Sequence, residues 1–158
     1  MISIQITDNK QFMSALLTTS AFDTFLLKEA QITTSISHLI DGHLRTTTEE
    51  DTPCESYISF EKVRTVLYDI IKGKKAPEVF KLILHVNHST LHALLDKSQI
   101  DLPDHTIKSF VLTIKYENQH ITLVTGTAYH TFTLDKSADS LWDQSLIRFL
   151  DYHHIAYE

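Results

Sequence analysis

The chain has 158 residues, of which 42% are hydrophobic and 22% charged, with 3 glycines, 3 prolines and a single cysteine. These proportions are typical of one globular domain with a substantial core, and they argue against a disordered chain or a small disulfide-stapled fold. The formal net charge of −6 counts against non-specific binding to a phosphate backbone, which needs clustered lysine and arginine.

The beginning of the chain carries no sign of export. Its first eight residues lack a basic segment followed by an apolar core, and no later run approaches the roughly 18 apolar residues that a membrane helix needs. The lone Cys54 excludes an intramolecular disulfide and fits a reducing compartment. We therefore expect a soluble, cytoplasmic protein.

The first forty residues predict a strand, a helix and a second strand. Residues 2–6 alternate between apolar and polar side chains, as a half-buried strand does. Asp8 suits the N-cap of a helix that carries Phe12 and Leu16 on one side. Residues 30–40 alternate again and predict another strand.

The next segment predicts a hairpin, a loop and a helix. Asp41-Gly42 is a strong signal for a type I′ turn, with a return strand starting at His43. Residues 46–55 are polar and acidic and predict a flexible loop. Ser59 suits the cap of the following helix, and Gly73 stands where a left-handed residue would end it.

The second half predicts the same kinds of element in the same order. A strand over 80–86 and a short helix over 89–95 come first. Three strands follow over 109–117, 120–125 and 129–134, joined by turns at 118–119 and 126–127, and a helix begins near Ala138.

The two halves of the chain are similar in sequence. An offset of 78 residues places Asn9, Ala15, Leu16, Leu17 and Ser20 on Asn87, Ala93, Leu94, Leu95 and Ser98. An offset of 79 aligns the apolar stripes of the last helix in each half. Such a repeat indicates one supersecondary unit used twice, so we expect a single α+β domain of two β-α-β-β-β-α units, 1–78 and 79–158.

Helices are expected to cover one face of the antiparallel sheets and to bury their apolar side chains. The residues expected in the core include Leu16, Leu67, Ile70, Leu94, Phe110, Leu112, Phe132, Trp142 and Phe149. The other face would be rich in β-branched and hydroxyl side chains, namely Thr33, Ser35, Thr113, Lys115, Thr122, Thr131 and Thr133. We predict that a protein partner or a second copy docks on this face.

The ten histidines raise the question of a metal site. His88 and His92 are spaced so that both could face one ion from a helix, but the sequence offers no evident third ligand. The simpler interpretation is scattered, solvated histidines, so we expect no bound metal and no cofactor.

Two further motifs have structural explanations. The cations Lys72, Lys74 and Lys75 gather at a predicted helix C-terminus, where the helix dipole favours them, and an anion site is the alternative. Thr125-Gly126-Thr127 lacks the context of a phosphate-binding loop and is interpreted as a β-turn. No nucleophile-elbow motif occurs, and the carboxylates beside Cys54 disfavour a reactive thiolate, so we expect no catalytic residue.

The chain contains, in this order, Ile40-Asp41-Gly42, Ile71-Lys72-Gly73-Lys74-Lys75, Pro77, Phe80-Lys81, Thr125-Gly126-Thr127, the run from Thr131 to Ser137, and Trp142-Asp143. Together these runs resemble a family of small uncharacterised proteins from clostridial Firmicutes, and the likeness spans nearly the whole chain. The family has no assigned activity, cofactor or catalytic residue. The resemblance therefore implies a bacterial, intracellular protein and supplies no site.

The functional expectation is a non-catalytic binding or assembly module, because no cluster of acid, base or ligand residues emerges from the sequence. Two alternatives stay open. The duplicated topology is similar to that of the TATA-binding protein and of sliding DNA clamps, which allows a nucleic-acid-associated protein, although fold does not imply function. An enzyme of unknown type is the other, and a pocket in which perturbed carboxylates or histidines converge would favour it.

Overall fold

The computed structural model describes residues 1–45, 55–73, 75–103 and 105–158. Their seven strands form one sheet, in the order β1-β7-β6-β5-β2-β3 with β4 beside β2, and every pairing is antiparallel. The strands are β1 Ser3–Gln5, β2 Phe25–Thr33, β3 Ser37–Asp41, β4 Ile58–Ser59, β5 Val79–Val86, β6 Ile107–Glu117 and β7 His120–Tyr129. The four helices are α1 Asn9–Thr18, α2 Phe60–Ile71, α3 His88–Ser98 and α4 Ser137–Tyr152.

Local sequence signals explain where the helices begin. The carboxylate of Asp8 accepts a hydrogen bond from the Gln11 backbone N–H at 3.0 Å and caps α1 as predicted. The Asn87 side chain caps α3 in the same way, accepting from the Thr90 N–H at 2.9 Å. These caps satisfy N–H groups that have no partner within the helix. None of the described helices is long and apolar enough to cross a membrane.

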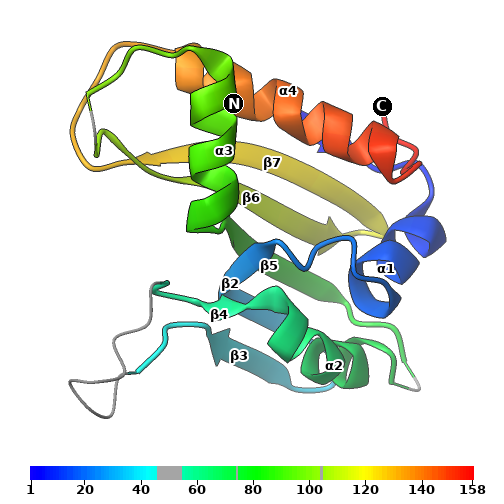
Figure 1. Ribbon diagram of the computed structural model, residues 1–158. Helices are drawn as coiled ribbons and strands as arrows, with labels where there is room; N and C mark the ends of the chain where they lie inside the picture. The colour runs from blue at the N-terminus through cyan, green and yellow to red at the C-terminus, as the bar shows by residue number, and fades with distance from the viewer. Residues whose placement is uncertain (46–54, 74, 104) are drawn as a thin grey trace.

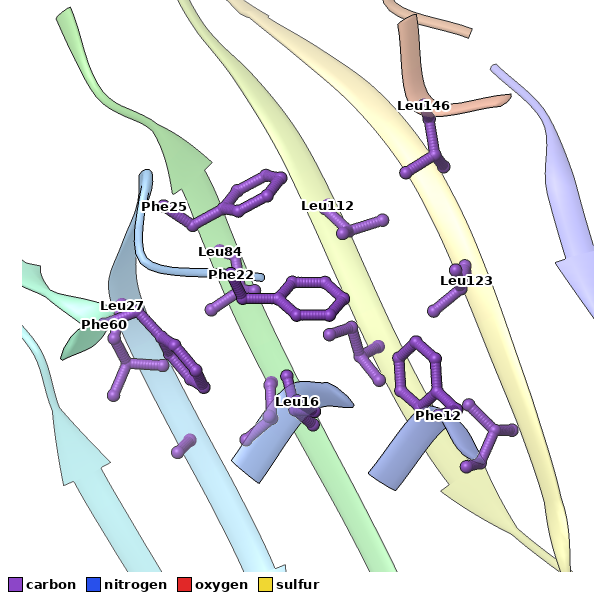
Figure 2. Packing of buried hydrophobic residues seen from close by; sticks show 14 of the residues in the cluster. Phe12, Leu16, Phe22, Phe25, Leu27, Phe60, Leu84, Leu112, Leu123 and Leu146 are labelled. Atoms are coloured by element: carbon purple, nitrogen blue, oxygen red, sulfur yellow. The ribbon is translucent and has the colours of Figure 1, made fainter. Parts of the chain in front are cut away.

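The helices pack on one face of the sheet, which confirms the predicted α+β class (Figure 1). Figure 2 shows the resulting core, in which phenylalanines from the helices and connections meet leucines from the strands. At its centre the Phe22 ring lies between 5.1 and 6.4 Å, centroid to centroid, from the rings of Phe12, Phe25, Phe60 and Phe149. This aromatic cluster ties α1, α2 and α4 to the start of β2.

Most of the residues expected in the core are buried there. Leu16, Leu67, Phe110, Leu112 and Trp142 are buried, and Ile70, Leu94 and Phe149 pack against them while partly exposed. The prediction for Phe132 is wrong, because its side chain is 88% exposed. The expected strand over 129–134 does not form: β7 ends at Tyr129, and Phe132 lies in the connection to α4.

The expected turn at Gly126-Thr127 is also wrong. Both residues lie inside β7, where Gly126 pairs with Val111 and Thr127 with Phe110 of β6. Glycine generally weakens a strand interior, but the pairing of Gly126 with Val111 shows that this glycine marks no break in β7. The turn predicted at Asn118-Gln119 is confirmed, and both residues have positive φ, 52° and 65°.

The predicted internal duplication is not confirmed. Under that prediction β1 and β5 are equivalent, yet β1 lies at the edge of the sheet beside β7, whereas β5 lies between β2 and β6. The first half contributes β1 to β4 and the second only β5 to β7. The sequence similarity is therefore local, and the two halves interleave in one sheet.

Gly42 does not form the predicted type I′ turn. The chain reverses earlier, around Thr34–Ile36, so that the expected single strand over 30–40 is the end of β2, a turn and most of β3. Gly42 instead packs against a bulge in β2, where its N–H donates to the Lys28 carbonyl at 2.9 Å. A Cβ at Gly42 would lie 1.7 Å from the Leu27 carbonyl oxygen, so close approach of two backbones explains the glycine.

Other boundaries agree more closely. Ser59 precedes α2 as predicted, although its side chain makes no capping hydrogen bond. Gly73 follows that helix, but no glycine in the described residues has positive φ. The loop predicted over 46–55, with Cys54, lies outside the described residues except for Glu55.

The core predicts a contrast between two phenylalanines. Phe22→Ala should cost about 3–5 kcal/mol in the free energy of unfolding, because it empties the centre of the aromatic cluster. Phe132→Ala should change the same quantity by less than about 0.5 kcal/mol, because that ring is in solvent. Urea denaturation of both variants measures the difference, and equal losses would contradict the assignment of the core.

A second contrast concerns two glycines. Gly42→Ala should destabilise the protein by about 1–3 kcal/mol, since the added methyl group meets backbone atoms that cannot rotate away. Gly73→Ala is the control, because its Cβ would come no closer than 3.9 Å to the nearest atom, the Ile70 carbonyl oxygen. Thermal melting followed by circular dichroism should show a lowered midpoint for the first variant alone.

Candidate functional site

Three strand ends and one helix meet at the end of the sheet opposite the Asn118-Gln119 turn. There β5 ends at Val86, β6 begins at Ile107 and β7 ends at Tyr129, and α3 starts directly after β5 (Figure 1). Two adjoining hollows of about 170 and 300 Å³ lie at this end and share four lining residues, His88, Leu91, Lys108 and His130. We call the two hollows together the histidine cleft.

Five of the ten histidines line this cleft. His85 comes from β5, His88 and His92 from α3, and His105 and His130 from the segments that enter β6 and leave β7. The expectation of scattered histidines does not hold for this group, although His88, His92, His105 and His130 are solvent-exposed as expected and only His85 is buried. Sequence reasoning singled out only the pair on α3, whose ring centroids lie 6.2 Å apart.

A metal ion in the cleft would need several ligand side chains arranged around it. Within the described parts of the chain, no group of three or more histidine, cysteine or carboxylate side chains is arranged to hold an ion. The imidazoles line the walls and do not converge on one point. The cleft presents imidazole nitrogen atoms and the Lys108 ammonium group, which can donate hydrogen bonds to a ligand.

One of these imidazoles is held by a carboxylate. Glu55 Oε2 lies 2.6 Å from Nδ1 of His88, and Glu55 Oε1 accepts the His88 backbone N–H at 2.7 Å. Both contacts fix the ring at the first turn of α3. A histidine–carboxylate pair can serve a nucleophile, but the nearby Ser109 hydroxyl is buried and donates to the backbone carbonyls of Val86 and Phe110.

Two of the cleft residues, Tyr57 and His85, belong to a row of three rings that meet edge to face or tilted. The Tyr57 ring lies 4.7 Å from that of His43 and 4.9 Å from that of His85, between centroids. His85 is only 5% exposed, and burial, aided by the positive charges of Lys28 and Lys108, lowers the pKa of His85 to about 4. This imidazole is therefore neutral at pH 7.

The threonine-rich face predicted from the sequence is only partly assembled. Lys115 pairs with Thr122, Thr113 lies two residues away on the same side of β6, and Thr33 lies on that side of β2. Ser35 lies in the β2–β3 turn, and Thr131 and Thr133 lie beyond β7, so none of these three belongs to the sheet face. Docking on the remaining face stays a prediction.

The predicted lysine cluster is described only in part. Lys72 forms the C-cap of α2 and lines a hollow of about 280 Å³ together with Lys10 and Tyr116. Lys75 is exposed, and Lys74 lies outside the described residues. A role in anion binding stays a prediction for these lysines.

The threonines of the Thr125-Gly126-Thr127 run have a structural role at one position. The Thr125 hydroxyl donates to the Asp143 carboxylate, and the Tyr129 hydroxyl donates to Asp139 at 2.9 Å. Burial raises the pKa of Tyr129 to about 12, and the contact with Asp139 adds to this effect, so the phenol keeps its proton. These bonds fasten α4 to β7.

The neutral His85 predicts a loss of stability in acid. Its pKa is lower in the folded chain than the 6.5 of a free imidazole, so the unfolded state binds more protons as the pH falls from about 6.5 towards 4. The free energy of unfolding should drop by about 2–3 kcal/mol over that range through this residue. Urea titrations at several pH values should show a shallower dependence for His85→Leu, with exposed His120→Gln as the control; an unchanged slope in His85→Leu would contradict the assignment.

Comparisons with known proteins assign a family and no activity. No curated protein and no solved structure matches the chain. A family model, described as a family of unknown function, DUF5721, matches residues 15–158, a span that includes every residue of the histidine cleft. The chain therefore belongs to this family of unknown function, DUF5721.

Proposed function

We propose that this protein is a non-catalytic binding module that holds a small organic anion in the histidine cleft. The observation that carries the proposal is that five histidines and Lys108 line two adjoining hollows at one end of the sheet. A concave site with a few convergent polar groups, one of them with a strongly perturbed pKa, is the ordinary form of a ligand site.

The charges of the cleft favour an anion. Lys108 is cationic, and imidazoles in general become cationic between about pH 8 and pH 5. Two carboxylates line the cleft: Asp96 in the larger hollow and Glu55, which is already engaged by His88. Attraction for an anion therefore depends on protonated imidazoles beside Lys108, which would offset the two carboxylates at mildly acidic pH.

The apolar part of the lining favours an organic ligand over a bare inorganic ion. The larger hollow is walled by Leu91, Leu95, Ile100, Leu102 and Ile107 in addition to its polar residues. Removing a hydrocarbon or ring from water against these side chains would add affinity that phosphate or sulfate cannot gain. A carboxylate or phosphate ester with an apolar part fits both kinds of lining.

The alternatives receive less support. Catalysis by the Glu55–His88 pair through Ser109 is disfavoured, since the Ser109 hydroxyl is buried and bound to backbone carbonyls. Nucleic-acid binding calls for a basic track along a surface. On the uncovered sheet face, Lys115 is instead paired with Glu117 at 3.0 Å.

We further propose that the chain forms a single domain and works in the cytoplasm of a bacterium, with a clostridial source as the finer expectation. The single cysteine supports a reducing compartment, and the interleaving of both halves in one sheet supports one domain.

Ligand binding is tested with phenyl phosphate and benzoate as probes, by calorimetric titration at pH 6 and pH 8. Binding should be tighter at pH 6, because imidazoles gain charge as the pH falls. Lys108→Gln should weaken it by roughly tenfold, the loss expected for one charged hydrogen bond. Exposed Lys81→Gln, on the middle of the uncovered face, is the matched control and should change nothing.

Some results of these titrations would contradict the proposal. Equal binding by wild type and Lys108→Gln, or equal losses in both lysine variants, would place the probes elsewhere and contradict the proposal. Failure of both probes and of their aliphatic analogues to bind or to raise the melting temperature would also contradict it.

A further inference from the structure

The connection between β7 and α4 exposes two large apolar side chains. The Phe132 side chain is 88% exposed and that of Leu134 is 83% exposed. The two residues are separated only by Thr133, in a segment without regular secondary structure. The segment is anchored at both ends: the His130 N–H donates to the Thr106 carbonyl at 2.9 Å, and the Asp135 carboxylate accepts the Ser137 N–H at 2.8 Å. An ordered segment that holds a phenylalanine and a leucine in water has the form of an interaction site.

A second apolar feature lies between α3 and α4. A groove of about 380 Å³ is lined by the buried core residues Phe25, Val86 and Trp142 and by the partly exposed Leu94 and Phe149, with Arg148 and Tyr152 among its exposed residues. We call it the α3–α4 groove. Tryptophan, tyrosine and arginine are the residue types most enriched where binding energy concentrates in protein interfaces.

We propose that the exposed segment 132–135 of one copy docks into the α3–α4 groove of a second copy. The groove supplies an aromatic cavity for Phe132 and Leu134. Its rim carries Arg148, and the segment carries Asp135 directly after Leu134, so the two features are complementary in charge as well as in polarity. The Asp135 carboxylate is held ionised by its hydrogen bonds to Ser137, which lower the pKa of Asp135.

The contact must be between copies. Phe132 and Leu134 are in solvent and so do not occupy the groove of their own chain. The segment precedes α4, and that helix begins at Ser137. Arg148 lies eleven residues after Ser137, a distance of about 16 Å along the helix axis. Segment and groove are thus different surfaces of one molecule, and their contact is head-to-tail.

A head-to-tail contact has a distinctive test, because each surface can be removed separately. The segment variant is Phe132→Ser with Leu134→Ser, and the groove variant is Arg148→Glu with Tyr152→Ser; all four side chains are exposed, so both proteins should melt near the wild-type temperature. Val66→Ser with Ile36→Ser, which removes exposed apolar side chains elsewhere, is the matched control.

Sedimentation velocity over a series of concentrations gives the result. Wild type and control should associate with rising concentration, and each surface variant alone should stay monomeric. An equimolar mixture of the two variants should form a dimer and nothing larger, because one intact segment then meets one intact groove.

Three outcomes would overturn the proposal: a wild type that stays monomeric up to millimolar concentration, a surface variant that associates like wild type, or a mixture that stays monomeric. If association instead disappears in Thr113→Glu with Lys115→Glu, and survives in both surface variants, the uncovered sheet face is the interface. None of these results depends on a ligand in the histidine cleft.

Discussion

The structure depends on the pairing of β5 with a neighbour on each side. Its register with β2, from the first half of the chain, and with β6, from the second, makes one sheet out of two sequence-similar halves. Alternate residues of the same strand, Phe80, Leu82 and Leu84, form part of the core beneath the helices. Because both ladders and the core use β5, displacing it would break the centre of the sheet and open the core, leaving β1 beside β7 as the other strand pairing between the halves.

The histidine cleft follows from where that strand ends. His85 and Val86 are its last residues, Asn87 caps α3, and His88 begins the helix, so the turn from strand to helix sets three cleft residues in place. The neighbouring strand ends add Lys108 and His130 from distant parts of the sequence. Glu55 then holds His88 across the cleft. The proposed binding role rests on this gathering of imidazoles and Lys108 in one cleft.

The two faces of the sheet have different physical characters. The helix-covered face is aromatic and aliphatic, and its surplus apolar surface reaches the exterior at the α3–α4 groove. The uncovered face mixes threonines with opposed charges such as the Lys115–Glu117 pair, which favours solubility over association. Self-association through the groove and the segment 132–135 is therefore compatible with a sheet face that stays in solvent.

Short-range patterns in the sequence determined the α+β class, the cap of α1 at Asp8, the turn at Asn118-Gln119 and most of the core, because helix caps, turn residues and hydrophobic period act within a few residues. The same patterns also suggested a turn at each of two glycines. Only the tertiary structure shows that Gly126 lies inside a strand and that Gly42 lies against the backbone of β2. The exposure of Phe132 was decided by where β7 ends, at Tyr129. The place of β1 beside β7 and the meeting of five histidines were likewise decided by strand order, which rests on hydrogen bonds between residues far apart in the chain. No local pattern encodes such pairings, since their free energy appears only when the whole sheet has formed.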